Sequence, residues 1–202
     1  NPFWPTLLAT VPMEQDAKVK SLAKALKLLS YFNTRTPELG ISDLAELSGN
    51  LKSTTHNIMS TYQQFGFVEK NPVSGKYRLG HKILELSNVF YIANDFRQIA
   101  RPFIERIANH CNETVYLAVP QMPNIMYIDA AYPQGSIHML SVIGVTAPMY
   151  CTAVGKAIMA HLSEQERAKV REYGLRPFTS KTICDMEMLE KDILQVQERG
   201  YA

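Results

Sequence analysis

The sequence predicts an α+β fold with an N-terminal winged helix-turn-helix, a linker helix and a C-terminal α/β domain. Two observations predict the first part. Apolar residues recur at helical spacing in several segments before residue 65, and a pattern typical of a short β-hairpin follows. A third observation concerns residues 95–202, where strand-like runs and helical patterns are mixed. With 202 residues, the chain is long enough for one or two domains that each bury a core.

The first predicted helix covers Ser21–Phe32, in which leucine, alanine and phenylalanine repeat at helical spacing. After a polar loop, Ser42 is predicted to cap a short second helix, Asp43–Ser48. That helix begins with an aspartate, whose charge is favourable near the positive end of the helix dipole. Gly49 then marks the turn before the third helix.

The third predicted helix, Leu51–Gln64, has the composition of a DNA recognition helix. Its predicted buried stripe consists of Leu51, Thr55, Ile58, Tyr62 and Phe65. The opposite face carries short hydrogen-bonding side chains and almost no acid, which suits contacts to base edges and phosphate oxygens. Asn50 is the expected N-cap, and Gly66 is the expected left-handed residue after the helix.

A β-hairpin is predicted next, with strands at Phe67–Lys70 and Lys76–Leu79 around a turn that contains Asn, Pro, Ser and Gly. Helices followed by such a hairpin are the order of a winged helix-turn-helix. Residues 1–80 contain nine Lys and Arg against six Asp and Glu, whereas residues 101–202 contain ten against eleven. The positive excess therefore lies on the segment that would meet DNA phosphates.

Residues 81–94 predict an apolar linker helix, which either packs on its own domain or pairs with a second subunit. A further helix is expected from Asp95 to about His110. Strand-like runs follow at Thr114–Val119, Ile125–Ala131, Ile137–Val142 and Ala147–Tyr150. Together these patterns predict a tail at 1–18, a DNA-binding domain at 19–80, the linker helix at 81–94 and a second domain of mixed helices and strands at 95–202.

The end of the chain predicts three more helices. Thr152 is the expected cap of a helix that runs to Ala160. Ser163 and Glu166 have the spacing of a capping box, in which each side chain bonds the other residue's backbone. The last helix is expected from Met186 to Arg199, where Gly200 ends it.

Several classes of protein are not predicted by this sequence. No apolar run approaches the roughly 20 residues of a membrane span, and the N-terminal stretch lacks the basic start of a secretory signal. The expected location is therefore the cytoplasm. The three cysteines, Cys111, Cys151 and Cys184, are widely spaced and predict neither a disulfide framework nor a zinc site. Because motifs of hydrolases, P-loop proteins and Rossmann enzymes are lacking, we expect no enzymatic activity, catalytic residue, cofactor, metal or membrane contact.

Several motifs in one order resemble the IclR family of bacterial transcriptional regulators. The matching stretches are Val19–Leu29, Gly49–Asn57, Gly75–Gly80, Ile143–Gly144, Pro148–Ala157 and Glu198–Tyr201. The resemblance implies a winged-helix domain, a linker helix that dimerises, and a C-terminal small-molecule sensor of GAF-like α/β fold. It also implies homodimers or tetramers that bind palindromic operators in double-stranded DNA.

Three departures from the family pattern affect these expectations. Asn57 stands where the family commonly has an arginine in the recognition helix, and Lys24 stands where it has an arginine in the first helix. An amide at position 57 suits adenine rather than guanine or phosphate, so the expected operator differs from that of relatives. In relatives an acidic motif, a cysteine-bearing strand region and a final helix follow the Gly-Tyr stretch, so the effector-binding domain is expected to be partial here.

The candidate DNA contacts come from the polar face of the recognition helix, the hairpin and the first helix. They are Lys52, Ser53, Thr54, His56, Asn57, Ser60, Lys76, Arg78 and Lys24. The hairpin residues are expected on the phosphate backbone, because hairpin tips reach the backbone or the minor groove. The alternative for the helix residues is an ordinary solvated face.

The candidate ligand contacts lie in the second half. Ala153 and Val154 open a helix whose N–H groups could face an anion, with Met139, Leu140 and Met149 as apolar walls. Such a site suits a small organic or aromatic acid, and the alternative is close packing of small residues. The predicted function is thus a DNA-binding regulator, expected to be a repressor, whose operator binding responds to a small metabolite. The alternative is a winged-helix protein-interaction module without sequence-specific DNA binding.

Overall fold

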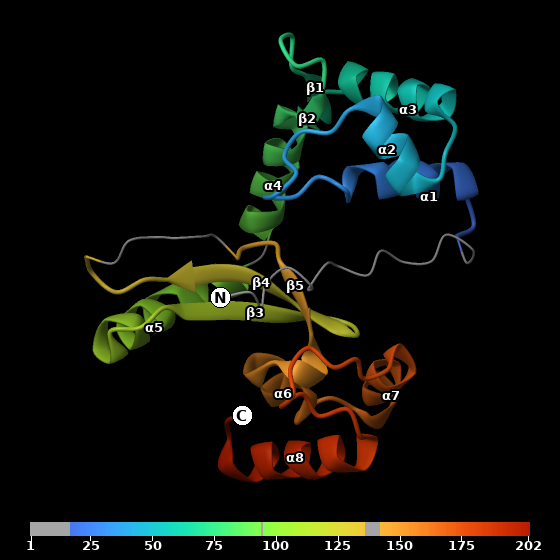
Figure 1. Ribbon diagram of the computed structural model, residues 1–202. Helices are drawn as coiled ribbons and strands as arrows, with labels where there is room; N and C mark the ends of the chain where they lie inside the picture. Colours follow the sequence, from blue (N-terminus) through green and yellow to red (C-terminus); the bar gives the residue numbers. More distant parts are fainter. Residues whose placement is uncertain (1–16, 94, 136–141) are drawn as a thin grey trace. The chain divides into compact units, whose positions relative to one another are not determined.

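The computed structural model describes residues 17–93, 95–135 and 142–202. Within these ranges the chain forms two compact units, one that ends at Asp95 and one that runs from Phe96 to Ala202 (Figure 1). Among the described residues, none of the helices combines the length and the apolar character that a membrane span requires.

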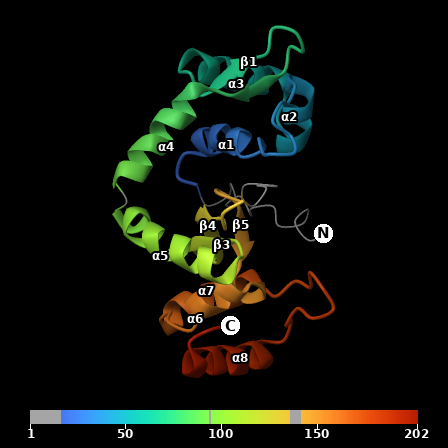
Figure 2. The same ribbon diagram turned by 90° about the vertical axis from the view of Figure 1, so that its left-hand side faces the viewer.

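The first unit contains helices and a hairpin in the predicted order. Its elements are α1 (Lys20–Leu29), α2 (Ile41–Ser48), α3 (Lys52–Gln64), β1 (Val68–Lys70), β2 (Tyr77–Leu79) and α4 (His81–Ala93). Figures 1 and 2 show α3 and the turn between β1 and β2 at the same end of this unit, with α1 away from that end. The hairpin is antiparallel and places Glu69 directly opposite Arg78.

The core of the first unit joins α1, α2, α3 and the hairpin. Its buried residues are Leu28, Phe32, Leu39, Leu44, Met59, Val68 and Tyr77. Two residues of the predicted buried stripe are exposed instead: Leu51 by 75 % and Phe65 by 64 %. The reason is that Leu51 is the N-cap and Phe65 the C-cap, so both lie outside the helical repeat. Met59, which the prediction omitted, is fully buried.

Two predicted caps are wrong and one end signal is confirmed. The residue that caps α2 is Gly40 rather than Ser42, and its N–H donates to the Asp43 carboxylate at 3.0 Å. The N-cap of α3 is Leu51 rather than Asn50, without a side-chain hydrogen bond to the cap. Gly66 follows α3 with φ of +77°, the left-handed conformation expected there.

Gly80 lies against the Gly66 turn at a point where the backbone leaves no room for a side chain. A Cβ atom at Gly80 would lie 2.3 Å from the carbonyl oxygen of Gly66. The N–H of Gly80 donates to Phe67 O at 2.8 Å, and the N–H of Lys82 donates to Gly66 O at 3.1 Å. The end of α3, the end of the hairpin and the start of α4 therefore meet backbone to backbone.

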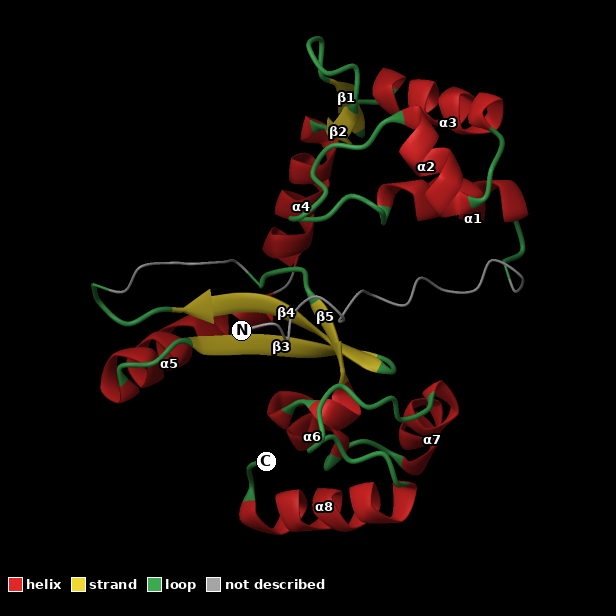
Figure 3. Ribbon diagram, in the orientation of Figure 1, coloured by secondary structure: helices red, strands yellow, loops and turns green. Residues whose placement is uncertain are grey.

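The second unit is a three-stranded antiparallel sheet with helices, in the order β3-β4-β5 (Figure 3). Its elements are α5 (Asp95–Cys111), β3 (Val115–Gln121), β4 (Asn124–Ala131), β5 (Thr146–Pro148), the 3-10 helix η3 (Met149–Cys151), α6 (Ala153–Met159), α7 (Glu164–Tyr173) and α8 (Met186–Arg199). The predicted strand Ile137–Val142 lies outside the described residues except for Val142. The predicted strand Ala147–Tyr150 is shorter and is followed by η3, so it was placed too far along the chain.

Local capping signals in the second unit are confirmed. The Thr152 hydroxyl accepts the N–H of Gly155 at 3.1 Å and so caps α6. Ser163 and Glu166 form the predicted capping box at the start of α7. Gly200 ends α8 in the left-handed conformation, with φ of +81°. The main core of this unit lies between the sheet and α6, α7 and α8.

Helix α5 is attached to β4 in two ways. Before Pro102, the side chains of Arg97 and Arg101 donate to the carboxylate of Asp129 at 2.8 and 3.0 Å. Asp129 is 1 % exposed, so the arginines supply the charge partners that a buried carboxylate requires. After Pro102, Ile104 and its neighbours pack on the end of β4.

Candidate nucleic-acid interface

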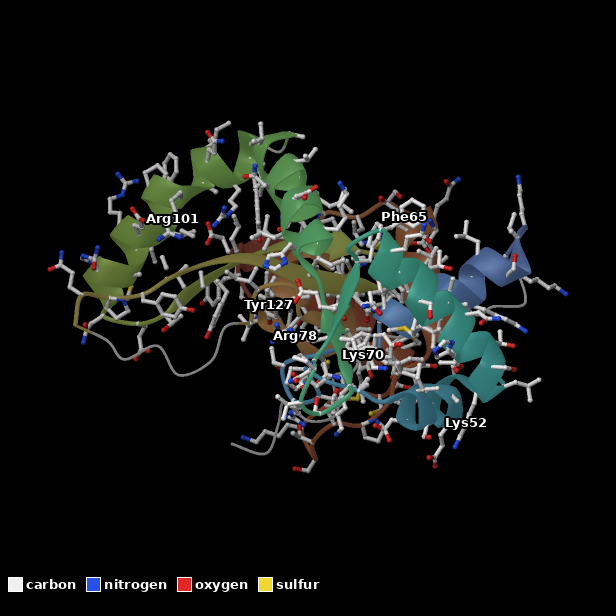
Figure 4. All side chains as sticks on the ribbon, turned by 90° about the horizontal axis from the view of Figure 1, so that it is seen from above. Lys52, Phe65, Lys70, Arg78, Arg101 and Tyr127 are labelled. Atoms are coloured by element: carbon white, nitrogen blue, oxygen red, sulfur yellow. The ribbon has the colours of Figure 1, made fainter. Side chains whose placement is uncertain are left out.

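The polar face of α3 is exposed along its length. Six predicted DNA contacts lie there, and each is exposed: Lys52, Ser53, Thr54, His56, Asn57 and Ser60. Within the described ranges, the polar side-chain atoms of Ser53, Thr54 and Asn57 have no hydrogen-bond partner. The other face holds Thr55 and Met59 in the core. Figure 4 looks down on this surface, with Lys52 and Phe65 marking the two ends of α3.

The turn between α2 and α3 is held by its own backbone and one serine. Gly49 has φ of +68° and donates its N–H to Glu46 O at 3.3 Å. The Ser48 hydroxyl donates to Leu44 O at 2.6 Å and accepts the N–H of Asn50 at 3.4 Å. These bonds fix the start of α3 relative to α2, which is what a helix-turn-helix needs to aim one helix at a groove.

The hairpin is fastened to the loop between α1 and α2. Leu39 and Tyr77 exchange two backbone hydrogen bonds, both 2.9 Å long. The carboxylate of Glu38 accepts from the Asn71 amide at 2.9 Å and from the Ser74 hydroxyl at 3.1 Å. These two hydrogen bonds are the main reason why the pKa of Glu38 lies below its ordinary value. The hairpin, hereafter the wing (residues 68–79), is thus held in position by the body of the unit.

The structure gives the positions of the two predicted wing contacts, Lys76 and Arg78, and an ion pair for Arg78. Both Lys76 and Arg78 are exposed. The Arg78 guanidinium donates from Nε and Nη2 to Glu69 Oε2 at 3.3 and 3.2 Å. The other oxygen of Glu69 contacts Nδ1 of His81. The prediction did not identify Glu69; the signal that could have found it is the hairpin register, which puts positions 69 and 78 opposite each other.

Lys24 is separate from the other candidates. It is exposed on α1, and α1 lies away from the end of the unit that presents α3 and the wing turn (Figure 2). The structure therefore brings together the residues of α3 and the wing, and it does not bring Lys24 to the same surface.

The ligand candidates of the second unit are only partly described. Met139 and Leu140 lie outside the described residues. Met149 is fully buried in the core. Ala153 is exposed and Val154 is half-buried at the start of α6, and no described residue accepts a hydrogen bond from either N–H group.

The second unit offers little to nucleophilic or metal chemistry in its described part. Burial raises the pKa of the Cys151 thiol to about 11, so the thiolate is scarce at neutral pH. Lys156 pairs with Asp192 at 2.7 Å. Among the described residues, no group of three or more His, Cys, Asp or Glu side chains could hold a metal ion.

Comparisons with known proteins agree on one family. The family described as "Bacterial transcriptional regulator IclR C-terminal" matches residues 91–202, and the "IclR helix-turn-helix domain" matches residues 21–72. The chain is 33 % identical to the HTH-type transcriptional regulator XynR of Escherichia coli K12, over 91 % of this chain and 73 % of that protein.

Two further relatives extend the comparison. The chain is 29 % identical to the transcriptional repressor IclR of Escherichia coli K12, over 96 % of this chain and 72 % of that protein. A crystal structure of an IclR transcriptional regulator from Alicyclobacillus acidocaldarius superposes with a TM-score of 0.80 at 26 % identity, over 92 % of this chain and 76 % of that chain.

Proposed function

The chain belongs to the IclR family of bacterial transcriptional regulators, and from that premise we propose that it binds operator DNA through α3 and the wing and acts as a repressor. It is a DNA-binding regulator and not an enzyme. A small metabolite bound in the second unit would alter operator binding. The cytoplasm is the location that such a role requires.

One observation carries the proposal for the DNA contacts. The exposed face of α3 presents the unengaged side-chain hydroxyl and amide groups of Ser53, Thr54 and Asn57 and, between residues 50 and 67, no acid. We assign base-edge contacts to Ser53, Thr54 and Asn57, with the Asn57 amide suited to adenine. Phosphate contacts are assigned to the basic and peripheral residues, which are Lys52, His56, Ser60, Lys76, Arg78 and, for long-range attraction only, Lys24.

The same proposal includes a homodimer or tetramer on a palindromic operator. No described residue of α4 is buried, and Leu84, Val89 and Ile92 are between 64 and 69 % exposed. Of the two alternatives for this helix, pairing with a second subunit is better supported than packing on its own unit. A second subunit would remove these exposed apolar side chains from water. A two-fold dimer presents two copies of α3, and its operator would have matching half-sites.

The function is tested by the salt dependence of duplex binding. The full chain is expected to bind a labelled duplex at low salt and to lose affinity steeply between about 50 and 200 mM salt, because phosphate contacts release counterions. Fluorescence anisotropy at several salt concentrations measures this. No affinity for duplex DNA at about 50 mM salt would contradict the proposal and favour the protein-interaction alternative.

The proposed effector site rests on Ala153 and Val154, whose N–H groups at the start of α6 suit a carboxylate. A small organic or aromatic acid is expected to stabilise the protein by about 2.7 kcal/mol at 100 times its dissociation constant. Thermal melts with a panel of aliphatic and aromatic carboxylic acids measure this. Ala153→Pro is the matched variant, since proline removes one N–H at a helix position that tolerates it. If no acid shifts the melt, or if the variant responds like the wild type, the site is wrong.

A further inference from the structure

Glu69 is an acid on the wing, where the proposed function calls for positive charge. It lies on β1, directly across from Arg78 on β2, and Figure 4 shows Arg78 on the strand pair beside α3. One carboxylate oxygen accepts both hydrogen bonds from Arg78, and the other contacts His81, the first residue of α4.

Glu69 differs from the other acid of this region, Glu38. Both oxygens of Glu38 accept hydrogen bonds from wing-turn side chains, so Glu38 fastens the wing to the body. Both oxygens of Glu69 face basic side chains, and one of those is a proposed phosphate contact. The partners of Glu69 therefore connect it with the strength of DNA binding and not only with the position of the wing.

The pair with Arg78 is weak enough to be exchanged. Its side chains are 53 % and 31 % exposed, and its N–O distances of 3.2 and 3.3 Å exceed those of strong charge-assisted bonds. Pairs of this kind contribute little to stability. A DNA phosphate can likewise accept two hydrogen bonds from the same guanidinium, one on each of two oxygens. Because His81 uses the other oxygen, Glu69 keeps a partner when Arg78 turns to DNA.

We propose that the Glu69 carboxylate binds the Arg78 guanidinium in place of a DNA phosphate. The pair thereby lowers the affinity of the wing for DNA of any sequence. The proposal rests on the proposed function. Each phosphate contact by Arg78 then includes the loss of the Glu69 pair. Glu69 is an affinity-setting residue that makes no contact with DNA.

A double-mutant cycle tests the proposal. The full chain and its Glu69→Gln, Arg78→Ala and doubly substituted variants are titrated onto a labelled mixed-sequence duplex by anisotropy. Glu69→Gln is expected to tighten binding about fivefold at low salt, because Arg78 then reaches its phosphate without first leaving an ion pair. Arg78→Ala in the Glu69→Gln background is expected to remove that gain.

The matched control is Glu85→Gln, which removes the same charge from α4 and releases Lys82 rather than a wing residue. It is expected to change binding less than twofold, and thermal melts check that every variant is folded. Unchanged or weaker binding by Glu69→Gln overturns the proposal, as does a gain that persists without Arg78 or that Glu85→Gln reproduces. If the wild type itself does not bind the duplex, the proposed function fails; if it binds and Glu69→Gln makes no difference, only this inference fails.

Discussion

Replacing Gly80 with alanine is expected to destabilise the first unit by about 4 kcal/mol or more, a large share of the roughly 5–15 kcal/mol by which folded proteins are usually stable. The new Cβ would lie 2.3 Å from the backbone oxygen of Gly66 and 3.1 Å from backbone carbons of Gly66 and Phe67. Because all three atoms belong to the main chain, no side-chain rotation relieves the contact. The backbone has to move, and the hydrogen bond from Lys82 to Gly66 is expected to break with it.

Chemical denaturation of the full chain, followed by circular dichroism, measures this loss. Gly40→Ala is the control, because its Cβ would meet only the carboxylate of Asp43 at 3.3 Å, which a side-chain rotation relieves. That substitution is expected to cost about 1 kcal/mol or less, as alanine is a poorer N-cap than glycine. A Gly80→Ala variant as stable as Gly40→Ala would show that this junction is not close-packed.

Replacing Ser53, Thr54 and Asn57 together by alanine is expected to weaken operator binding by at least about 100-fold, since each good base contact contributes 1–3 kcal/mol. Binding to a mixed-sequence duplex should change far less, because phosphate contacts supply it. The three side chains are exposed and bond no described residue, so the fold should be unaffected. An operator selected by the wild type from a randomised duplex pool is the probe.

The control is a second triple alanine variant on the same helix, at Thr61, Gln63 and Gln64, which are also exposed and polar. These residues lie in the last turn of α3 and are not proposed contacts. Their replacement is expected to change operator affinity less than about threefold, since surface changes away from a contact have small effects. Equal losses in the two variants, or an unchanged preference in the first, would contradict the assignment of the recognition face.

The parts of the fold that could be predicted are those with local signals. Gly66, Thr152 and Gly200 stop or start helices because a left-handed backbone or a cap hydroxyl acts within a few residues of its own position. The exposed face of α3 was predictable for the same reason, since polar positions at helical spacing define it. The buried face was predicted less well, because Leu51 and Phe65 keep the spacing of the helix although they lie one residue before its start and one residue after its end.

The contacts of the wing could not be predicted from the order of residues alone. The pair of Glu69 with Arg78 depends on the hairpin register, and the bonds of Glu38 to the wing turn join positions more than thirty residues apart. Met149 illustrates the same limit in the second unit. Its apolar character fits the wall of a ligand site and the interior of a core equally well, and the structure places it in the core.

The junction of Gly66, Gly80 and Lys82 has a consequence for building hybrid regulators. A chimera that joins the DNA-binding residues of this chain to another sensor immediately after Gly80 would discard the backbone bond from Lys82 to Gly66. The foreign segment would then have to recreate that bond to support the end of α3. A joint after Ala93, the last residue of α4, keeps the whole junction together with α3.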